Sequence, residues 1–566
     1  MDFKTAIPLG QLLVDRGVIS EEQLQKALRR QKETGTLLGI TLMELGYISE
    51  ETMFLPIVAG QWGVDFVNLK EIKIPSSTLS YIPAKLASHY KVIPFEYKNG
   101  FLKIATTEPL NIHLMDEIDS AVQIPVKPVL ATAKDIAEAI REYYGVGAET
   151  IDAMMTSVES LNASDSEVQD IAASAEEASI AKFLNQILLE AFRDRATDIH
   201  IEPFEDELLI RYRVDGTLCD AKVPSNIKHF KDSINLRIKV LSNLNIAEKR
   251  MPQDGRFKVK VGNVEIDLRV SFLPTPYGES VVLRILNSAR LYDFKELGLN
   301  AQEQKILEDL IKRPHGIVFL TGPTGSGKTT TLYSCLSRIN TEDKKVITIE
   351  DPIEYQLKGI TQIQVNPLIG LTFAHGLRSM LRHDPDIMMV GEVRDIETAE
   401  IAIQVALTGH LVFSTLHTND AASGVARLLD MGVDPYLVTS TVDCFIAQRL
   451  IRLLCPKCKQ PSKITEEVIK ELDGQVHIDP SLKVFEPKGC EACKMTGYFG
   501  RHSIYEFLLI DDTISALIMK RVTSNEIKEL AVKKGMKTLR QSGWEKVQQG
   551  LTTPQEVLRV TREEKQ

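Results

Sequence analysis

Residues 316–339 read GIVFLTGPTGSGKTTTLYSCLSRI, and this stretch decides the fold of the surrounding chain. An apolar strand leads into a glycine-rich loop over residues 322–329, and a helical segment follows. The loop matches the pattern GxxxxGK[ST], in which backbone N–H groups surround nucleotide phosphates, and its flanks supply the strand and helix that the motif requires. The sequence therefore predicts a nucleotide site formed by Gly322, Pro323, Thr324, Gly325, Ser326, Gly327, Lys328, Thr329 and Thr330.

Two side chains of this loop have roles that follow from their chemistry. Lys328 supplies a point charge to the β- and γ-phosphates, and Thr329 offers its hydroxyl to Mg²⁺. The predicted ligands are therefore ATP and Mg²⁺.

Apolar runs around the loop predict the rest of this domain. The runs IVFLTG, KVITIED, IMMVGE and HLVFSTL alternate with helical segments. This texture is typical of a parallel α/β sheet that is covered on both faces. The carboxyl ends of such strands gather at one edge, where ligands bind.

Three candidate catalytic side chains directly follow these strands. We favour Glu350 for orienting or deprotonating the attacking water, and Glu392 is placed to hold Mg²⁺ through water. The alternative is that both acids only cap the helices that follow. His417 follows the strand LVFSTL, where it is predicted to hydrogen-bond a γ-phosphate oxygen and sense hydrolysis. A purely structural histidine is the alternative.

Length and composition limit the class of protein. A chain of 566 residues is too long for one hydrophobic core, so three or four domains are expected. No apolar run approaches the roughly 18 residues that span a bilayer, and the N-terminus has no secretory pattern. We therefore expect a cytoplasmic protein. The net charge of −10 argues against a dedicated nucleic-acid binder.

The N-terminal region contains an internal repeat. LGQLLVDRGVISEE, residues 9–22, aligns with LGITLMELGYISEE, residues 38–51, and each copy predicts a helix, a glycine stop and a serine cap. Short strands and helices follow to residue 145. Eight acidic and no basic residues within 148–178 then favour a solvated linker with some helical structure.

The seven cysteines divide into two groups. Cys219, Cys335 and Cys444 are isolated, and we expect small buried side chains there. Cys455, Cys458, Cys490 and Cys493 form two CxxC pairs, which in a cytosolic chain favour a closed structural zinc site. Redox-active cysteines are the alternative.

Several motifs resemble the assembly ATPases of bacterial type II secretion and type IV pilus machines. IEDPIEYQ, IMMVGEVRD, TGHLVFSTLHTND and CFIAQRLIRLLCPKC resemble the aspartate box, Walker B, histidine box and C-terminal signatures of that family. ATDIHIEP, IRYRVDG and MPQDGR, which lie between residues 196 and 256, extend the match. The resemblance covers the chain from about residue 180 to its C-terminus. It implies a homohexameric ring in which a PAS-like domain precedes a RecA-like motor domain.

The resemblance also gives a role to arginines of the second module. It implies that Arg211, Arg213 and Arg269 reach the phosphates as the PAS-like domain closes over the motor domain. The alternative is an ordinary solvated strand face. In the same family, extension motors carry the tetracysteine insertion, which agrees with structural zinc.

The N-terminal repeat resembles a tandem motif that binds cyclic di-GMP in some of these ATPases. Pro8 stands where that motif has arginine, so a phosphate- or guanine-contacting cation is lost. We therefore expect docking to the inner-membrane platform and recruitment proteins, with cyclic di-GMP binding as the alternative.

These observations predict an α/β multidomain ATPase that powers pilus or pseudopilus assembly at the inner membrane. The phrase YYGVGAET favours the secretion branch slightly, and retraction motors generally lack both the large N-terminal module and the zinc insertion. A nucleic-acid translocase and a nucleotide-binding scaffold with little hydrolysis are the alternatives from other classes. The expected divisions are a docking module (1–145), the acidic linker (146–178), the PAS-like domain (179–291), the RecA-like domain (292–454), the zinc insertion (455–500) and a C-terminal helical region (501–566).

Overall fold

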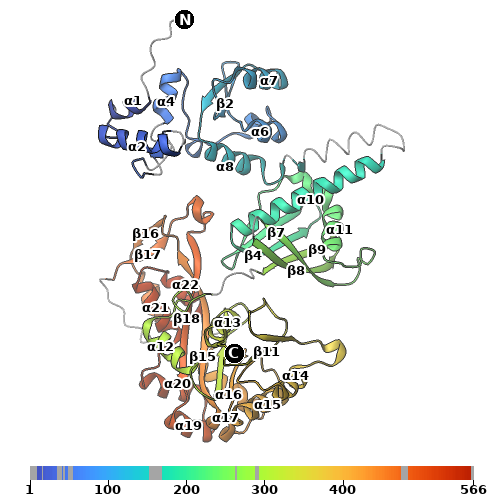
Figure 1. Ribbon diagram of the computed structural model, residues 1–566, viewed down its shortest axis with the longest axis vertical. Helices are drawn as coiled ribbons and strands as arrows, with labels where there is room; N and C mark the ends of the chain where they lie inside the picture. Colours follow the sequence, from blue (N-terminus) through green and yellow to red (C-terminus); the bar gives the residue numbers. More distant parts are fainter. Residues whose placement is uncertain are drawn as a thin grey trace. The chain divides into compact units, whose positions relative to one another are not determined.

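The computed structural model describes residues 9–15, 17–34, 38, 41–42, 45–48, 55–148, 150–151, 169–261, 264–286, 292–472 and 482–561. The chain forms two compact units. The first comprises residues 1–258 and 268–285, and the second comprises residues 259–267 and 286–566. Figure 1 shows the course of the chain through its helices and strands.

The N-terminal part of the first unit contains the sequence repeat. Gly17 and Gly46, at equivalent positions of the two copies, both have φ of 71°. Ser20 caps the second helix of the first copy, because its Oγ accepts from the backbone N–H of Gln23 at 3.2 Å. Apolar side chains of both copies join one buried cluster of Leu13, Ile19, Leu24, Ala27, Leu42 and Ile48. The predicted glycine stop and serine cap are confirmed in the first copy, whereas Pro8 and residues 49–51 lie outside the described residues.

A three-stranded sheet, β1-β2-β3, follows the repeat. β1 and β2 are antiparallel, and β2 and β3 are parallel. The elements of this part are α1 Leu9–Asp15, α2 Glu21–Thr34, α4 Leu55–Trp62, η2 Leu69–Glu71, α5 Ser76–Leu79, α6 Ala84–Tyr90, β1 Ile93–Lys98, β2 Phe101–Thr106, α7 Ile112–Val122, β3 Val126–Leu130 and α8 Ala133–Tyr144.

The second part of this unit is a six-stranded sheet with the order β6-β5-β4-β9-β8-β7. Its elements are α10 Gln169–Arg193, β4 Ala196–Pro203, β5 Leu208–Val214, β6 Thr217–Asp220, η3 Ser225–Phe230, α11 Lys231–Leu241, β7 Gln253–Val261, β8 Val264–Thr275 and β9 Gly278–Leu286. The pairs β4–β5, β4–β9 and β5–β6 are antiparallel, and this sheet with its helices agrees with the predicted α/β module. Helix α10 begins at Gln169, inside the segment predicted as a linker, so the end of that segment is helical.

The second unit is built on a seven-stranded sheet with the order β12-β11-β13-β14-β10-β15-β18. The first six strands are parallel, and β18 is antiparallel to β15. Alternate residues of the central strands enter two separate apolar clusters, for example Phe319 in one and Val318 in the other. The predicted parallel sheet, buried on both faces, is therefore confirmed.

The elements of the second unit begin with α12 Ala301–Leu310, β10 Gly316–Thr321, α13 Lys328–Ile339, β11 Val346–Glu350, β12 Thr361–Gln364, η4 Pro367–Ile369, α14 Phe373–Met380, η5 Leu381–His383, β13 Ile387–Val390, α15 Ile396–Leu407, β14 Leu411–Leu416, α16 Ala421–Asp430 and α17 Pro435–Thr441. They continue with β15 Val442–Leu454, β16 Lys459–Ser462, α18 Glu466–Leu472, β17 Val484–Pro487, η6 Glu491–Cys493, β18 Tyr498–Leu509, α19 Asp512–Met519, α20 Ser524–Lys533, α21 Leu539–Gln548 and α22 Pro554–Thr561.

The C-terminal region contains the predicted helices and, in addition, a long strand. It opens with the long strand β18, which crosses the predicted boundary at residue 500 and pairs with β15 from Leu509 to Tyr498. Four helices, α19 to α22, follow this strand. Because β15 lies more than forty residues earlier in the chain, the pairing is a long-range contact that local sequence does not reveal.

Candidate active site

The phosphate loop joins β10 to α13 as the motif predicts. Gly322, Gly325 and Gly327 have φ of 148°, 79° and 90°, and residues with a Cβ rarely adopt such values. The Nζ of Lys328 donates to the carbonyl oxygens of Gly322 at 2.7 Å and Pro323 at 3.1 Å. The loop therefore curls around its own lysine at the N-terminus of a helix, a geometry suited to phosphate binding.

Lys328 is 8% exposed, and its surroundings act on its charge. Burial lowers the pKa of Lys328 to about 8, the Glu392 carboxylate opposes this shift, and the nearby Arg449 guanidinium adds to it. The ammonium group thus lies within the electrostatic reach of an acid from another strand. Anionic phosphates would favour the charged form of this lysine.

The three candidate catalytic residues follow neighbouring parallel strands. Glu350 ends β11, Glu392 follows β13, and His417 follows β14, while the phosphate loop follows β10 next to β14. Backbone bonds join these ends: the N–H of Gly322 donates to Leu416 O at 3.3 Å. The strand register therefore brings Glu350, Glu392, His417 and the phosphate loop to one edge of the sheet.

Glu392 and His417 contact each other directly. Nε2 of His417 lies 2.8 Å from Oε2 of Glu392, and the other carboxylate oxygen pairs with Arg394. The Glu392 side chain is 12% exposed, whereas that of His417 is 46% exposed. The sequence placed both residues at strand ends but did not predict their contact, and it did not single out Arg394.

Glu350 is 3% exposed and accepts hydrogen bonds from three side chains. Thr348 Oγ1 donates at 2.6 Å, Gln362 Nε2 donates at 3.1 Å, and the Tyr333 hydroxyl donates to the other oxygen. Burial raises the pKa of Glu350, and these donors oppose the shift. An ionised carboxylate has about four acceptor sites, so three donors leave room for one more.

The arginines predicted to act from the second module lie in the first unit. Arg211 pairs with Glu202 at 2.6 Å, and Nε of Arg213 lies 3.8 Å from Asp198. Both side chains alternate with the buried Ile210 and Tyr212 along β5, as the strand period predicts. Arg269 lies on β8 of the same sheet. The approach of these three arginines to the phosphates stays a prediction.

The four paired cysteines form one cluster in the second unit. Their sulfur atoms all lie within 4.8 Å of one another. Sγ–Sγ distances are 3.8 Å for Cys455–Cys490, 3.8 Å for Cys458–Cys493 and 3.6 Å for Cys490–Cys493. A tetrahedron with Zn–S bonds of about 2.3 Å has sulfur–sulfur edges of about 3.8 Å. The residues therefore fit the predicted four-thiolate zinc site.

Backbone groups favour the thiolate form of Cys493, whereas burial raises the pKa of Cys455 and Cys458. Burial alone would raise the pKa of Cys493, but the N–H groups of Cys490 and Gly497 bond to its sulfur and bring the pKa to about 7. These N–H groups lie 3.1 and 3.2 Å from the sulfur. Cys455 and Cys458 lie between β15 and β16, and Cys490 and Cys493 lie between β17 and β18. Figure 1 shows the β16–β17 pair near one end of the β15–β18 pair.

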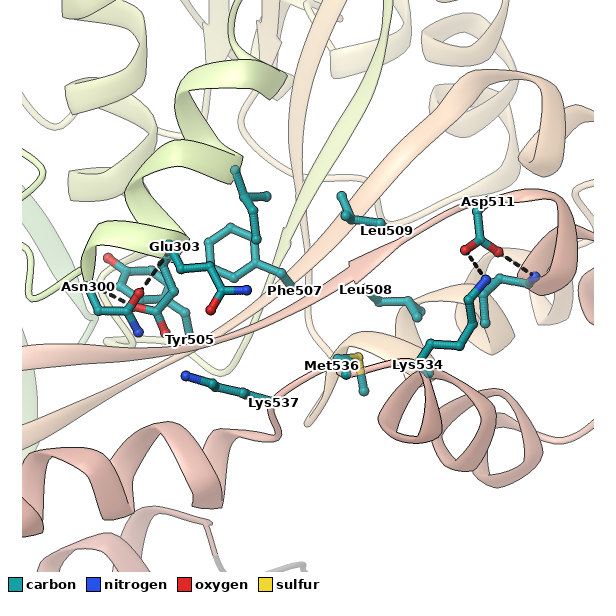
Figure 2. Close-up of a pocket in the computed structure, with 15 residues that line it drawn as sticks. Asn300, Glu303, Tyr505, Phe507, Leu508, Leu509, Asp511, Lys534, Met536 and Lys537 are labelled. Atoms are coloured by element: carbon teal, nitrogen blue, oxygen red, sulfur yellow. Dashed lines mark hydrogen bonds and ion pairs between the residues drawn. The ribbon is translucent and has the colours of Figure 1, made fainter.

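A separate cavity of about 250 Å³ lies in the second unit. Figure 2 shows it between α12, β18 and the turn before α21, with Asn300 and Glu303 on one side and Lys534 paired with Asp511 on the other. None of the predicted site residues lines it. The cavity is therefore distinct from the phosphate-loop edge.

Comparison with known proteins assigns most of the chain to one family. The family model "Type II/IV secretion system protein" matches residues 173–559, and the MshEN domain model matches residues 62–150. The type IV pilus assembly ATPase PilB of Myxococcus xanthus is 40% identical over 558 residues, which cover 97% of this chain and 98% of PilB. Type II secretion system protein E of Xanthomonas campestris pv. campestris is 41% identical over 558 residues, with 97% of each chain covered.

A solved structure supports the fold. The ATPase DotB of Yersinia pseudotuberculosis matches with a TM-score of 0.51 and 20% identity, covering 67% of this chain and 93% of DotB. The described residues include no helix long and apolar enough to cross a membrane. With its phosphate loop and acidic strand ends, the chain is an ATPase and belongs to the Type II/IV secretion system protein family.

Proposed function

We propose that this chain is the hexameric motor that powers assembly of a pilus or pseudopilus fibre at the cytoplasmic face of the inner membrane. The observation that carries the proposal is the edge of the second unit, where the phosphate loop, Glu350, Glu392 and the Glu392–His417 contact lie together. Relatives that match nearly the whole chain are named for pilus assembly and type II secretion.

In this proposal the side chains at the edge divide the work of hydrolysis. Lys328 binds the β- and γ-phosphates of ATP, and Thr329 and Glu392 hold Mg²⁺, the acid through water. Bound Mg²⁺ supplies positive charge against the phosphates. Glu350 uses its remaining acceptor site to orient the attacking water and take its proton. His417 is held by Glu392 at 2.8 Å, and it reports the state of the γ-phosphate to the loop that follows β14.

The second part of the proposal concerns motion. Arg211, Arg213 and Arg269 add positive charge to the phosphates when the PAS-like domain closes over the motor domain, and such cationic contacts are worth about 10³ or more in turnover. Loss of phosphate weakens the attraction, so the domains separate. We place the hinge between the two domains at about residues 288–299, of which 288–291 lie outside the described residues. In a hexameric ring, closure of the two domains at different times in the six subunits would displace a partner at the centre.

The N-terminal module is proposed to dock the motor to the membrane platform and its recruitment proteins. The MshEN domain model matches residues 62–150, which supports an N-terminal module of the kind named by that model. The match does not include the repeat of residues 9–51. Cyclic di-GMP binding is the less favoured role, because Pro8 replaces the arginine of the binding motif. The four-cysteine cluster is proposed to hold one structural zinc ion, since all four ligands come from the protein.

Between the two branches we favour type II secretion slightly, with pilus assembly close behind. The phrase YYGVGAET supports this preference, while the two relatives at 40% and 41% identity carry one name from each branch. The acidic net charge of −10 speaks against a nucleic acid as the cargo.

The proposal is tested with Glu392→Gln in the native host and in purified protein. We expect the purified variant to form hexamers by mass photometry and to bind ATP, but to lose most turnover. Cells that carry only this variant should lose either the secreted proteins or the surface pili, and the lost product identifies the branch. Normal secretion and normal piliation would contradict the proposed function, as would ATP hydrolysis at the wild-type rate.

A further inference from the structure

Strand β15 runs past the end of the strand that leads into the phosphate loop. The parallel pairing of β10 with β15 ends at Thr321 opposite Ala447. β15 continues to Leu454, so Gln448 and Arg449 lie beside the loop that follows Thr321. The proposed mechanism gives neither residue a role.

Close contacts show how tightly this segment fits against the phosphate loop. A Cβ on Gly322 would lie 2.7 Å from the carbonyl oxygen of Gln448 and 3.2 Å from Nη1 of Arg449. A Cβ on Gly327 would lie 2.8 Å from the side-chain nitrogen of Gln448. Two glycines of the motif are therefore needed not only for their φ angles but also because β15 occupies the space that a side chain would take.

Arg449 also contacts the loop that carries His417. Its Nη2 donates to the carbonyl oxygen of Asn419 at 2.9 Å and to the Asn419 side-chain oxygen at 3.1 Å. Its Nη1 donates to the carbonyl oxygen of Gln448 at 3.2 Å. The planar guanidinium thus spans from the backbone beside Gly322 to a residue two positions after His417.

We propose that Arg449 is a positioning residue for ATP hydrolysis, which fixes the His417 loop relative to the phosphate loop through its fork of bonds to Asn419 and Gln448. The inference rests on the proposed role of His417. The loop is anchored on both sides of Asn419, because His417 contacts Glu392 and Asp420 pairs with Lys528 at 2.9 Å. Arg449 supplies a further anchor from β15, beside Gly322.

The geometry requires arginine in particular. A guanidinium donates through several N–H groups in a fixed plane, whereas a lysine ammonium acts as a single point charge on a flexible stem. Arg449→Lys would keep the positive charge near Lys328 but could not hold Asn419 and Gln448 at the same time. The conservative substitution therefore separates the effect of charge from the effect of the bridge.

The test is a double-mutant cycle in the full chain, with kcat and ATP affinity measured for each variant. Arg449→Ala should lower kcat at least tenfold in the wild-type background and change the Kd for ATP less than threefold. In the His417→Ala background, the same change should lower kcat less than threefold further. Arg449→Lys should retain ATP affinity, and its kcat should fall almost as far as that of Arg449→Ala.

Arg452 is the matched control, because it lies three residues further along β15 and pairs with the buried Glu556 at 2.8 Å. Arg452→Ala should lower Tm, and any effect on kcat should be the same factor with or without His417. Equal factors for Arg449→Ala in both backgrounds would overturn the inference, as would full turnover by Arg449→Lys. If His417→Ala alone hydrolyses ATP at the wild-type rate while Arg449→Ala does not, the role of His417 fails and so does this inference, whereas the ATPase activity stands.

Discussion

The four-cysteine cluster gives a prediction whose size follows from its geometry. Three sulfur–sulfur distances of 3.6 to 3.8 Å already match a zinc tetrahedron, so little rearrangement is needed for binding. Structural zinc in small peptides contributes about 10–16 kcal/mol of binding free energy. If the four thiolates share this equally, Cys458→Ser removes about 3 kcal/mol, which is roughly a hundredfold in zinc affinity.

The assay is metal content together with thermal unfolding of the purified chain. Wild-type protein should carry about one zinc per chain after gel filtration, and Cys458→Ser should lose it to a chelator that leaves the wild type loaded. The variant should also unfold at a lower Tm, because the site joins β15 to the β16–β17 pair. Cys219→Ser is the control, since Cys219 is half-buried and lies outside the cluster. Metal-free, fully folded wild-type protein from a zinc-replete preparation would refute the reasoning.

Four further predictions concern hydrolysis and regulation. Lys328→Ala should abolish nucleotide binding or turnover in a nucleotide-binding and ATPase assay, and wild-type behaviour would contradict the phosphate-loop assignment. If Glu350 is the base, hydrolysis requires its ionised form, and burial raises its pKa above the ordinary value for glutamate. The kcat should therefore fall as the pH drops towards that raised pKa. Glu350→Gln should lower kcat by about a hundredfold or more. Calorimetry with cyclic di-GMP should show weak or no binding to the full chain because of Pro8, and submicromolar affinity would show that the apolar repeat suffices. Arg213→Ala should keep ATP affinity within roughly tenfold of the wild type but lose most turnover. A pair of distance labels, one on each domain, should show less ATP-driven closure in this variant than in the wild type. Equal closure and equal turnover would mean that Arg213 lies on an ordinary solvated strand face.

The parts of the fold that the sequence predicted are those set by local signals. The phosphate loop is specified by eight consecutive residues, and apolar runs located the strands that end at Glu350, Glu392 and His417. Parallel strands in one sheet present their carboxyl ends together, so the shared edge followed from the pattern alone. The cysteine spacing likewise predicted a cluster that the structure brings within 4.8 Å.

The contacts that escaped prediction depend on pairing between distant segments. Tyr333 and Gln362 come from α13 and β12, and only the sheet register brings both to Glu350. The sequence did not predict strand β18, because its pairing partner, β15, lies far away in the chain. Arg449 belongs to a signature that the sequence analysis recognised. Its position beside Gly322 arises because β15 extends seven residues beyond the end of its pairing with β10, and no local pattern predicts that length.

The same strand bears on whether the metal cluster and hydrolysis are coupled. Cys455 follows β15 six residues after Arg449, so the metal site and the arginine are linked through one strand. However, β15 is paired with β18 on its other side from Cys444 to Leu454, and Arg449 lies inside that ladder opposite Ile504. These backbone bonds hold Arg449 without help from the cysteines. Loss of zinc should therefore destabilise the β16–β17 arm while kcat for ATP hydrolysis stays unchanged, and a parallel loss of both would place the metal within the hydrolytic machinery.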